Sequence, residues 1–243
     1  MRGGSLSVTS LTLSMASAPD VVRELRTIAD PSRTPGMARV GIDVKRALGV
    51  SIPQLRSMAK RLGRDHGLAL ALWRSGIHEA RILASMVDDP ALVTREQMQG
   101  WAHDFGSWDV CDQVCSNLFG ATRYAYSAAR TWTRSPEEFV KRAGFTLIAE
   151  RAVHDKLAPD DVFERFLPVI HRGSRDERNS VKKAVNWALR QIGKRNLALN
   201  AAAMTAAERL LELDSRSETW IARDALRELR SPGVQARLRS TAG

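Results

Sequence analysis

Cysteine and long apolar runs are scarce in this 243-residue chain, and each scarcity excludes a class of protein. The only two cysteines, Cys111 and Cys115, can build neither a zinc quartet nor a disulfide that closes a long loop. We interpret them as small buried residues of a protein in a reducing compartment, the cytoplasm. The five histidines show no ligand spacing, so we expect no metal and no cofactor. No apolar run approaches the ~18 residues of a membrane span, so we expect no membrane partner.

Acidic residues are outnumbered, with 27 Asp and Glu against 37 Lys and Arg, which gives a formal net charge of +10. Such an excess favours a polyanionic partner, either nucleic acid or an anionic membrane. No polybasic block flanks an apolar helix, as a membrane-binding segment requires. The charge therefore indicates nucleic acid.

The first residues differ in composition from the rest of the chain. Residues 1–17 are rich in Ser, Thr and Gly, and their short apolar stretch is interrupted by hydroxyl residues, unlike an export signal. We expect a disordered leader over 1–17 and a single domain over 18–243. Met1 and Met15 both remain possible translation starts.

Helix punctuation recurs from residue 18 onward and predicts an all-α chain. Capping-box patterns begin at Ser51, Thr94, Ser135, Ser174 and Thr205. No segment of useful length alternates apolar and polar residues, so no strand is expected. The expected helical segments are 52–62, 68–73, 77–87, 96–104, 108–119, 123–132, 137–153, 161–171, 176–193, 206–213 and 220–229.

A basic position recurs when the helical segments are aligned with one another. Arg142, Lys183 and Arg223 lie about 40 residues apart, the period of two-helix HEAT units, whereas Arg81 precedes Arg142 by about 60. We interpret the longer interval as extra helices inserted in the array. In a stack of helix pairs such a position forms a row of cations along the concave surface, which suits a phosphate backbone. The alternative is that each cation is merely solvated on a helix flank.

The segment from Ser107 to Gly120 is expected to form one short helix. Trp108 and Asp112 are four residues apart and therefore share a face. An indole and a carboxylate together suit a cationic ligand or a cationic transition state. The structural alternative is a buried Trp beside an Asp near a helix start. Asp109 fits that alternative, because the first turn of a helix favours an anion.

Trp187 stands four residues after Lys183 and thus on the same face as the expected cation row. A role facing a ligand and a role in the core remain equally open for it. The other tryptophans outside the 108 helix receive the core interpretation; these are Trp73, Trp101, Trp132 and Trp220.

Five segments together resemble the AlkD-type DNA alkylation repair proteins, over about residues 21–238. The matching pieces are Gly49-Val-Ser-Ile-Pro-Gln-Leu-Arg56, His78-Glu-Ala-Arg81, Ser107-Trp-Asp-Val-Cys-Asp112, Phe139-Val-Lys-Arg142 and Lys182-Lys-Ala-Val-Asn-Trp-Ala-Leu-Arg190. The resemblance implies an all-α, HEAT-like helical-repeat solenoid with a basic concave surface. It also implies a glycosylase that excises cationic N3- or N7-alkylated purines from duplex DNA, acting as a monomer at the nucleoid.

The resemblance also implies roles for particular residues. Asp112 matches the family's catalytic carboxylate, Trp108 and Trp187 match the two indoles that flank the modified nucleotide, and Arg142 matches a backbone-contacting arginine near the lesion. Where the family commonly has a further arginine, this chain has Lys141. Further DNA contacts are expected from Arg81, Lys141, Lys183 and Arg223. Two other functions stay open: a non-catalytic binder of damaged or branched DNA, and a helical scaffold for an acidic partner.

Overall fold

The computed structural model describes residues 16–213 and 215–240, which form α-helices and two short 3₁₀ turns and contain no strand. The expected leader over 1–17 lies outside these residues except for Ala16 and Ser17. The Ser17 side chain accepts a hydrogen bond from the Asp20 amide and caps the first helix. The helices are α1 Ala18–Thr27, α2 Thr34–Arg39, α3 Ile52–Leu62, α4 His66–Arg74, α5 His78–Val87, α6 Arg95–His103, α7 Trp108–Asn117, α8 Ala125–Trp132, α9 Glu138–His154, α10 Asp160–Glu164, α11 Leu167–Gly173, α12 Asn179–Gly193, α13 Leu197–Leu211, α14 Arg216–Leu229 and α15 Pro232–Ser240.

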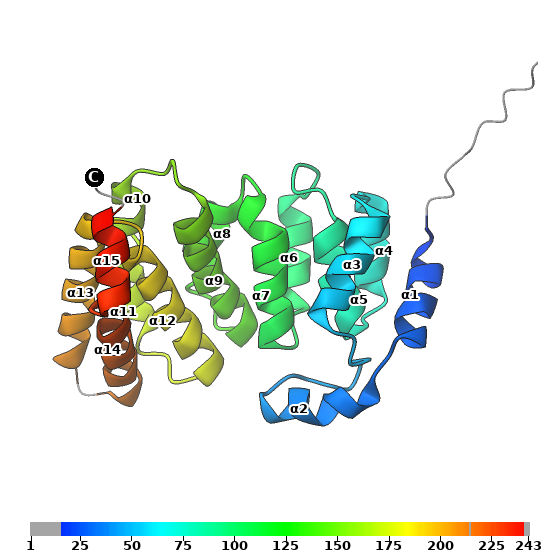
Figure 1. The fold of residues 1–243 in the computed structure, drawn as a ribbon, viewed down its shortest axis with the longest axis horizontal. Coiled ribbons are helices and arrows are strands. Elements are labelled where there is room, and N and C mark those ends of the chain that lie inside the picture. The colour runs from blue at the N-terminus through cyan, green and yellow to red at the C-terminus, as the bar shows by residue number, and fades with distance from the viewer. Residues whose placement is uncertain (1–15, 214, 241–243) are drawn as a thin grey trace, which may run out of the picture.

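The helices are stacked side by side in one elongated array, with α1 at one end and α13 to α15 at the other (Figure 1). One row, here called the inner row, consists of α3, α5, α7, α9, α12 and α14, each packed against the next. Behind it α4 packs on α5, α8 on α9, α11 on α12, and α13 on α12 and α14. No helix in the described part of the chain is both long and apolar enough to cross a membrane.

Side-chain bonds between neighbouring inner helices give the repeat length directly. His78 bonds Asp109, 31 residues on; Thr146 bonds Asp112, 34 residues back; and Asn186 bonds Asp224, 38 residues on. The long interval between Arg81 and Arg142 therefore holds two short repeats in register. The extra helices expected in this interval are α6 and α7, and α7 takes a regular place in the inner row between α5 and α9.

Two of the five predicted capping boxes lie at helix starts. Ser51 forms the full box with Gln54, and Thr94 accepts from the Gln97 amide. The other three predictions were wrong. The Ser135 hydroxyl accepts from the Glu137 amide in the turn before α9.

The remaining two hydroxyls lie at a helix end and inside a helix. Ser174 follows the end of α11 and donates to the carbonyl of His171. Thr205 lies inside α13, which the Asn196 side chain caps nine residues earlier. A local pattern cannot distinguish a cap from a hydroxyl that bonds a carbonyl within or after a helix.

The core between the rows is apolar and contains a cluster of rings. Trp73 stacks on Trp101 with ring centroids 3.9 Å apart, and Phe119 lies 6.0 Å from Trp132. The core interpretation is thus confirmed for these three tryptophans, which are at most 5% exposed. It was wrong for Trp220, which is 39% exposed on α14. Trp220 lies on the exposed face of α14, because the residues that this helix buries, such as Ile221, Ala222 and Ala225, lie on its other face.

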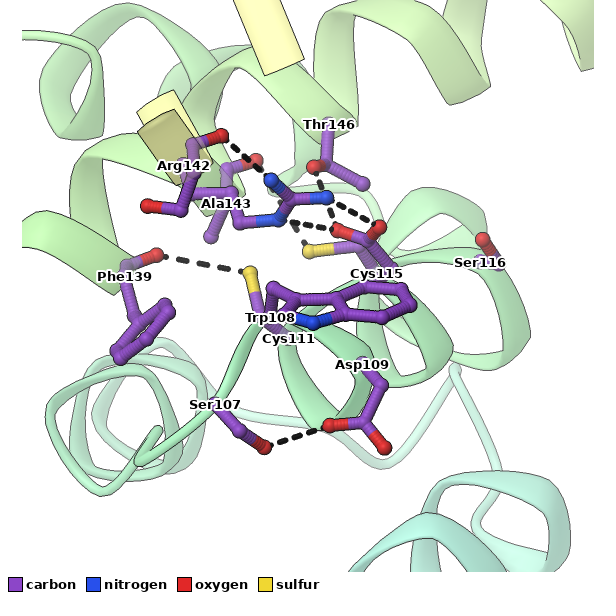
Figure 2. Close-up of polar contacts among 12 residues, drawn as sticks. Ser107, Trp108, Asp109, Cys111, Cys115, Ser116, Phe139, Arg142, Ala143 and Thr146 are labelled. Atoms are coloured by element: carbon purple, nitrogen blue, oxygen red, sulfur yellow. Dashed lines mark hydrogen bonds and ion pairs between the residues drawn. The ribbon is translucent and has the colours of Figure 1, made fainter. Parts of the chain in front are cut away.

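The two cysteines are free and buried, as expected, and they lie between α7 and α9. The Cys111 thiol donates to the carbonyl of Phe139 at 3.5 Å, and the Cys115 thiol to that of Ala143 at 3.9 Å. Figure 2 shows both thiols pointing from α7 toward α9. These small side chains let the two helices approach closely, which sets the position of Trp108 and its neighbours.

The segment from α2 to α3 is held against the inner row by one buried carboxylate. Glu79, on α5, accepts from the amides of Leu48 and Gly49 at 2.7–2.9 Å. Gly49 has a φ of 78°, and a Cβ there would lie 2.0 Å from the carbonyl oxygen of Asp30. Only glycine tolerates both the positive φ and the close approach of the Asp30 carbonyl without strain. This anchoring places the segment beside α5 and α7.

Candidate functional site

A cavity of about 440 Å³ lies between the α2–α3 segment and the inner row. Its walls include Trp108 and Asp112 from α7, Trp187 from α12, and Met37 and Ile42 from the α2–α3 segment. Trp108 is fixed by its indole N–H, which donates to the carbonyl of Val40 at 2.9 Å. Trp187, which lies far along the chain from Trp108 and Asp112, therefore lines the same cavity as those two residues.

Asp112 is held by a forked ion pair with Arg142 from α9. The Arg142 Nε donates to Oδ1 at 2.9 Å and Nη2 to Oδ2 at 2.6 Å, and the Thr146 hydroxyl also donates to Oδ1, at 3.1 Å. Burial disfavours the charge on Arg142, but the bond to Asp112 outweighs it and raises the pKa of the guanidinium. The guanidinium therefore keeps its charge, and its fork fixes the Asp112 carboxyl group beside the cavity.

Arg142 itself is 6% exposed and also donates to the carbonyl of Ser180. Its guanidinium lies 5.7 Å from the centre of the Trp108 ring, on which it rests (Figure 2). Through these three hydrogen bonds and the ring contact, Arg142 orients Asp112 and Trp108. Its expected contact with a DNA phosphate stays a prediction.

A second carboxylate of the cavity, Asp109, is paired with His78 from α5. His78 Nε2 lies 2.8 Å from one Asp109 oxygen, and the Ser107 hydroxyl donates to the other at 2.6 Å. Ser107 is the N-cap residue of α7, but its hydroxyl bonds this carboxylate and caps no amide. Burial opposes charge on both partners, yet their mutual bond raises the pKa of His78 and lowers that of Asp109.

The cations expected along the inner row fall into two groups. Arg81 donates to the carbonyl of Asp104 at 2.8 Å and lies 4.9 Å from the Trp73 ring, and Lys141 pairs with Asp176 at 2.8 Å. In contrast, Lys183 and Arg223 are exposed, and neither has a hydrogen bond or ion pair to another described residue.

Lys183 lines a second hollow of about 680 Å³ that also contains Trp108 and Arg142. Trp108 thus separates it from the cavity of Asp112 and Trp187. The structure brings Trp108, Asp112, Arg142, Trp187 and Lys183 together and leaves Arg81, Lys141 and Arg223 elsewhere along the row.

His78, Asp109 and the wall formed by the α2–α3 segment are cavity features that the sequence did not predict. The 31-residue spacing of His78 and Asp109 equals the repeat between α5 and α7. Recognition of α6 and α7 as a regular repeat would therefore have predicted that these two residues lie side by side. Nothing local marks the α2–α3 wall. Within the described residues, no group of three or more His, Cys, Asp and Glu side chains could hold a metal ion.

Comparison with known proteins places these features in a family context. The sequence model of the family described as DNA alkylation repair enzyme matches residues 21–229. No curated protein matches the chain.

Two solved structures are similar to the chain to different degrees. One is described as belonging to "a new family of proteins related to the HEAT-like repeat DNA glycosylases with affinity for branched DNA structures"; it is 18% identical, with a TM-score of 0.71, over 79% of this chain and 83% of that one. A designed armadillo repeat protein in complex with a (KR)4 peptide is 14% identical over 94% of both chains, but its TM-score of 0.32 supports no conclusion. The first likeness confirms the predicted all-α, HEAT-like fold.

Proposed function

The chain belongs to the family of DNA alkylation repair enzymes, and from this premise we propose that it is a DNA glycosylase. Its proposed substrate is duplex DNA that carries cationic N3- or N7-alkylated purines. Its proposed reaction is hydrolysis of the N-glycosidic bond of the alkylated nucleotide. The observation that carries the proposal is that two indoles and a carboxylate held by an arginine, Trp108, Trp187 and Asp112, line the same cavity.

The chemistry of the substrate explains why so few groups are needed. Alkylation at N3 or N7 makes the purine a cation, so the departing base leaves neutral when it takes the electron pair of the C1′–N bond. No proton has to be delivered to the leaving group. Water adds to C1′ of the oxocarbenium-like sugar and loses its proton. A single carboxylate near the sugar can stabilise that cation and orient the water.

Asp112 fits the role of this carboxylate because its position is preorganised. The fork from Arg142 fixes both of its oxygens in place, so little reorganisation is required as charge develops on the sugar. We assign Arg142 the part of a positioning residue, which acts through Asp112.

The two indoles fit recognition of a cationic nucleotide. An aromatic face attracts a cation, and the attraction strengthens when water is excluded. Lys183, beside Trp108 in the second hollow, is placed to bind a phosphate of the same strand. A protein that binds the phosphate backbone in this way does not have to extrude the lesion into a deep pocket, as most glycosylases do. The cavity walls on the inner row are compatible with a lesion that stays stacked in the duplex.

The decisive experiment is release of free bases. Purified protein is incubated with methylated duplex DNA, and the released bases are separated by chromatography. We expect 7-methylguanine or 3-methyladenine to appear in amounts that rise with protein concentration. Absence of any released base at saturating protein would overturn the glycosylase assignment.

A second candidate function is supported by one observation and uses the same fold. Both Asp112 oxygens already accept hydrogen bonds within the protein, an arrangement that also suits a purely structural ion pair. The chain would then bind damaged or branched DNA without excision; the similar solved structure is described as having affinity for branched DNA. Tight binding to a DNA junction without base release supports this candidate.

A further inference from the structure

An exposed tryptophan on α14 stands among cations, away from the cavity described above. Trp220 is 39% exposed and is the only aromatic residue among the exposed large apolar side chains of the described chain. It lines a hollow of about 640 Å³ together with Arg216, Arg223 and Arg227. Residues 216, 220, 223 and 227 are spaced four, three and four apart, so they occupy one face of the helix.

The hollow carries an excess of positive charge. Asp224 is its one carboxylate, and it already bonds Asn186 and Arg227. Neither Arg216 nor Arg223 has a partner among the described residues. A further cation comes from α12, because the Lys182 ammonium lies 5.2 Å from the centre of the Trp220 ring. An anion is therefore the favoured occupant of this surface.

The aromatic ring narrows the class of anion. An indole that stays partly exposed to water gives up burial free energy that a core position would provide. A partner that stacks on the exposed part of the ring would recover it. Bases in a duplex are stacked on one another and offer no free face, whereas each unpaired base does. Proteins bind single strands with aromatic side chains, on which the bases stack, and with surrounding cations, which contact the phosphates.

We propose that the α14 face of Trp220, Arg216 and Arg223 binds an unpaired nucleotide of a DNA strand next to the duplex held along the inner row. This site is distinct from the proposed excision cavity. The inference depends on the proposed function only in assuming that a duplex is bound next to the site. Its position follows from the stack: α14 is the neighbour of α12, which carries Trp187 and Lys183. The site gives the protein a preference for DNA with a single-stranded arm.

The test compares two DNA probes that differ only in the arm. One is a blunt duplex, and the other is the same duplex with an overhang of about six thymidines, within the site size of single-strand binders. Affinities are measured by fluorescence anisotropy. We expect the full-length protein to bind the overhang probe about 5- to 10-fold more tightly, as stacking of one base gives. Equal affinity for the two probes would overturn the proposal.

Variants assign the preference to the α14 face. Trp220→Ala should remove the advantage of the overhang and leave the blunt-duplex affinity unchanged, and Trp220→Phe should restore most of it. Arg223→Ala should make the salt dependence of overhang binding shallower by about 0.7 in slope. The matched controls are Leu211→Ala, which removes a 44% exposed apolar side chain on α13, and Arg209→Ala, which removes an exposed cation of the same helix. Both should keep the preference.

Two outcomes separate this proposal from the glycosylase assignment. If Trp220→Ala weakens blunt and overhang binding equally, Trp220 is a general DNA contact and the proposal is wrong. If the protein releases no base but keeps a Trp220-dependent overhang preference, the glycosylase assignment fails and the single-strand site stands. Circular dichroism melting of Trp220→Ala should lie close to that of the wild type, because Trp220 does not belong to the buried core cluster.

Discussion

Replacing Asp112 by asparagine tests the centre of the proposed site, because it removes one charge and changes few atoms. The asparagine oxygen can still accept from Arg142 and Thr146. The amide nitrogen, however, faces the second guanidinium donor, which now bonds an oxygen at 2.6 Å. The change therefore breaks one arm of the fork and leaves the Arg142 cation without a counter-ion.

The cost in stability follows from the burial of the pair. Removing one partner of a fully buried ion pair costs about 3–5 kcal/mol. Here the Asp112 side chain is 18% exposed and the Arg142 side chain 7%, and one arm survives, so we expect about 2 kcal/mol. For a domain of this size that lowers the melting temperature by about 4–8 °C. The variant therefore remains folded at 25 °C.

The effect on excision is expected to be much larger than that on stability. Loss of a preorganised group facing a developing charge lowers the rate by about 10²- to 10³-fold. The measurement is the single-turnover rate of 7-methylguanine release from duplex DNA at saturating protein, well below the melting transition. Binding of the same DNA, measured by anisotropy, should change little.

The controls separate the charge from the fold. Asp109→Asn neutralises a carboxylate of the same helix and cavity and should reduce excision far less. The double variant Asp112→Asn with Arg142→Gln removes the unpaired cation, so its melting temperature should recover while excision stays lost. A wild-type rate for Asp112→Asn, or equal losses for the two asparagine variants, would refute the assigned role.

Three further predictions concern the groups around Asp112. Trp187→Ala should abolish most excision and lower the free energy of unfolding by less than the ~3–5 kcal/mol of a core tryptophan, because its ring is only partly buried at the cavity. A loss of the full core value in urea unfolding would show that Trp187 serves packing and not the cavity. Lys183→Ala should make the salt dependence of duplex affinity shallower by about 0.9 in slope, whereas Arg81→Ala should not, since its guanidinium already bonds a carbonyl of the protein; equal slopes for both would contradict the assignment. His78→Gln should destabilise the protein most at pH about 4–6.5: the raised pKa of His78 stabilises the fold below the unfolded pKa of about 6.5, and this stability is lost as pH rises through the folded pKa. The lowered pKa of Asp109 stabilises the fold only above the unfolded pKa of about 4. If the pair were not ionised, the difference in unfolding free energy between the variant and the wild type, measured by chemical unfolding, would be the same at every pH.

The sequence by itself determined the class of fold and the chemistry available to it. Helical periodicity and caps such as those at Ser51 and Thr94 act within a few residues, so they can be read locally. The spacing of Trp108 and Asp112 is likewise a property of one helix, and it predicts one shared face before any packing is known. Charge composition indicated a polyanionic partner for the same reason, because it does not depend on the fold.

Only the tertiary structure decided which of these groups meet and which are neutralised. Arg81 and Arg142 occupy the same repeat position as the exposed Lys183 and Arg223, yet the first two are bonded to acceptors brought by neighbouring helices. Trp220 likewise turned out exposed, since the rotation of α14 depends on the packing of its other face. Pairings between helices depend on the offset between repeats and on burial, and these arise from the whole stack of helices.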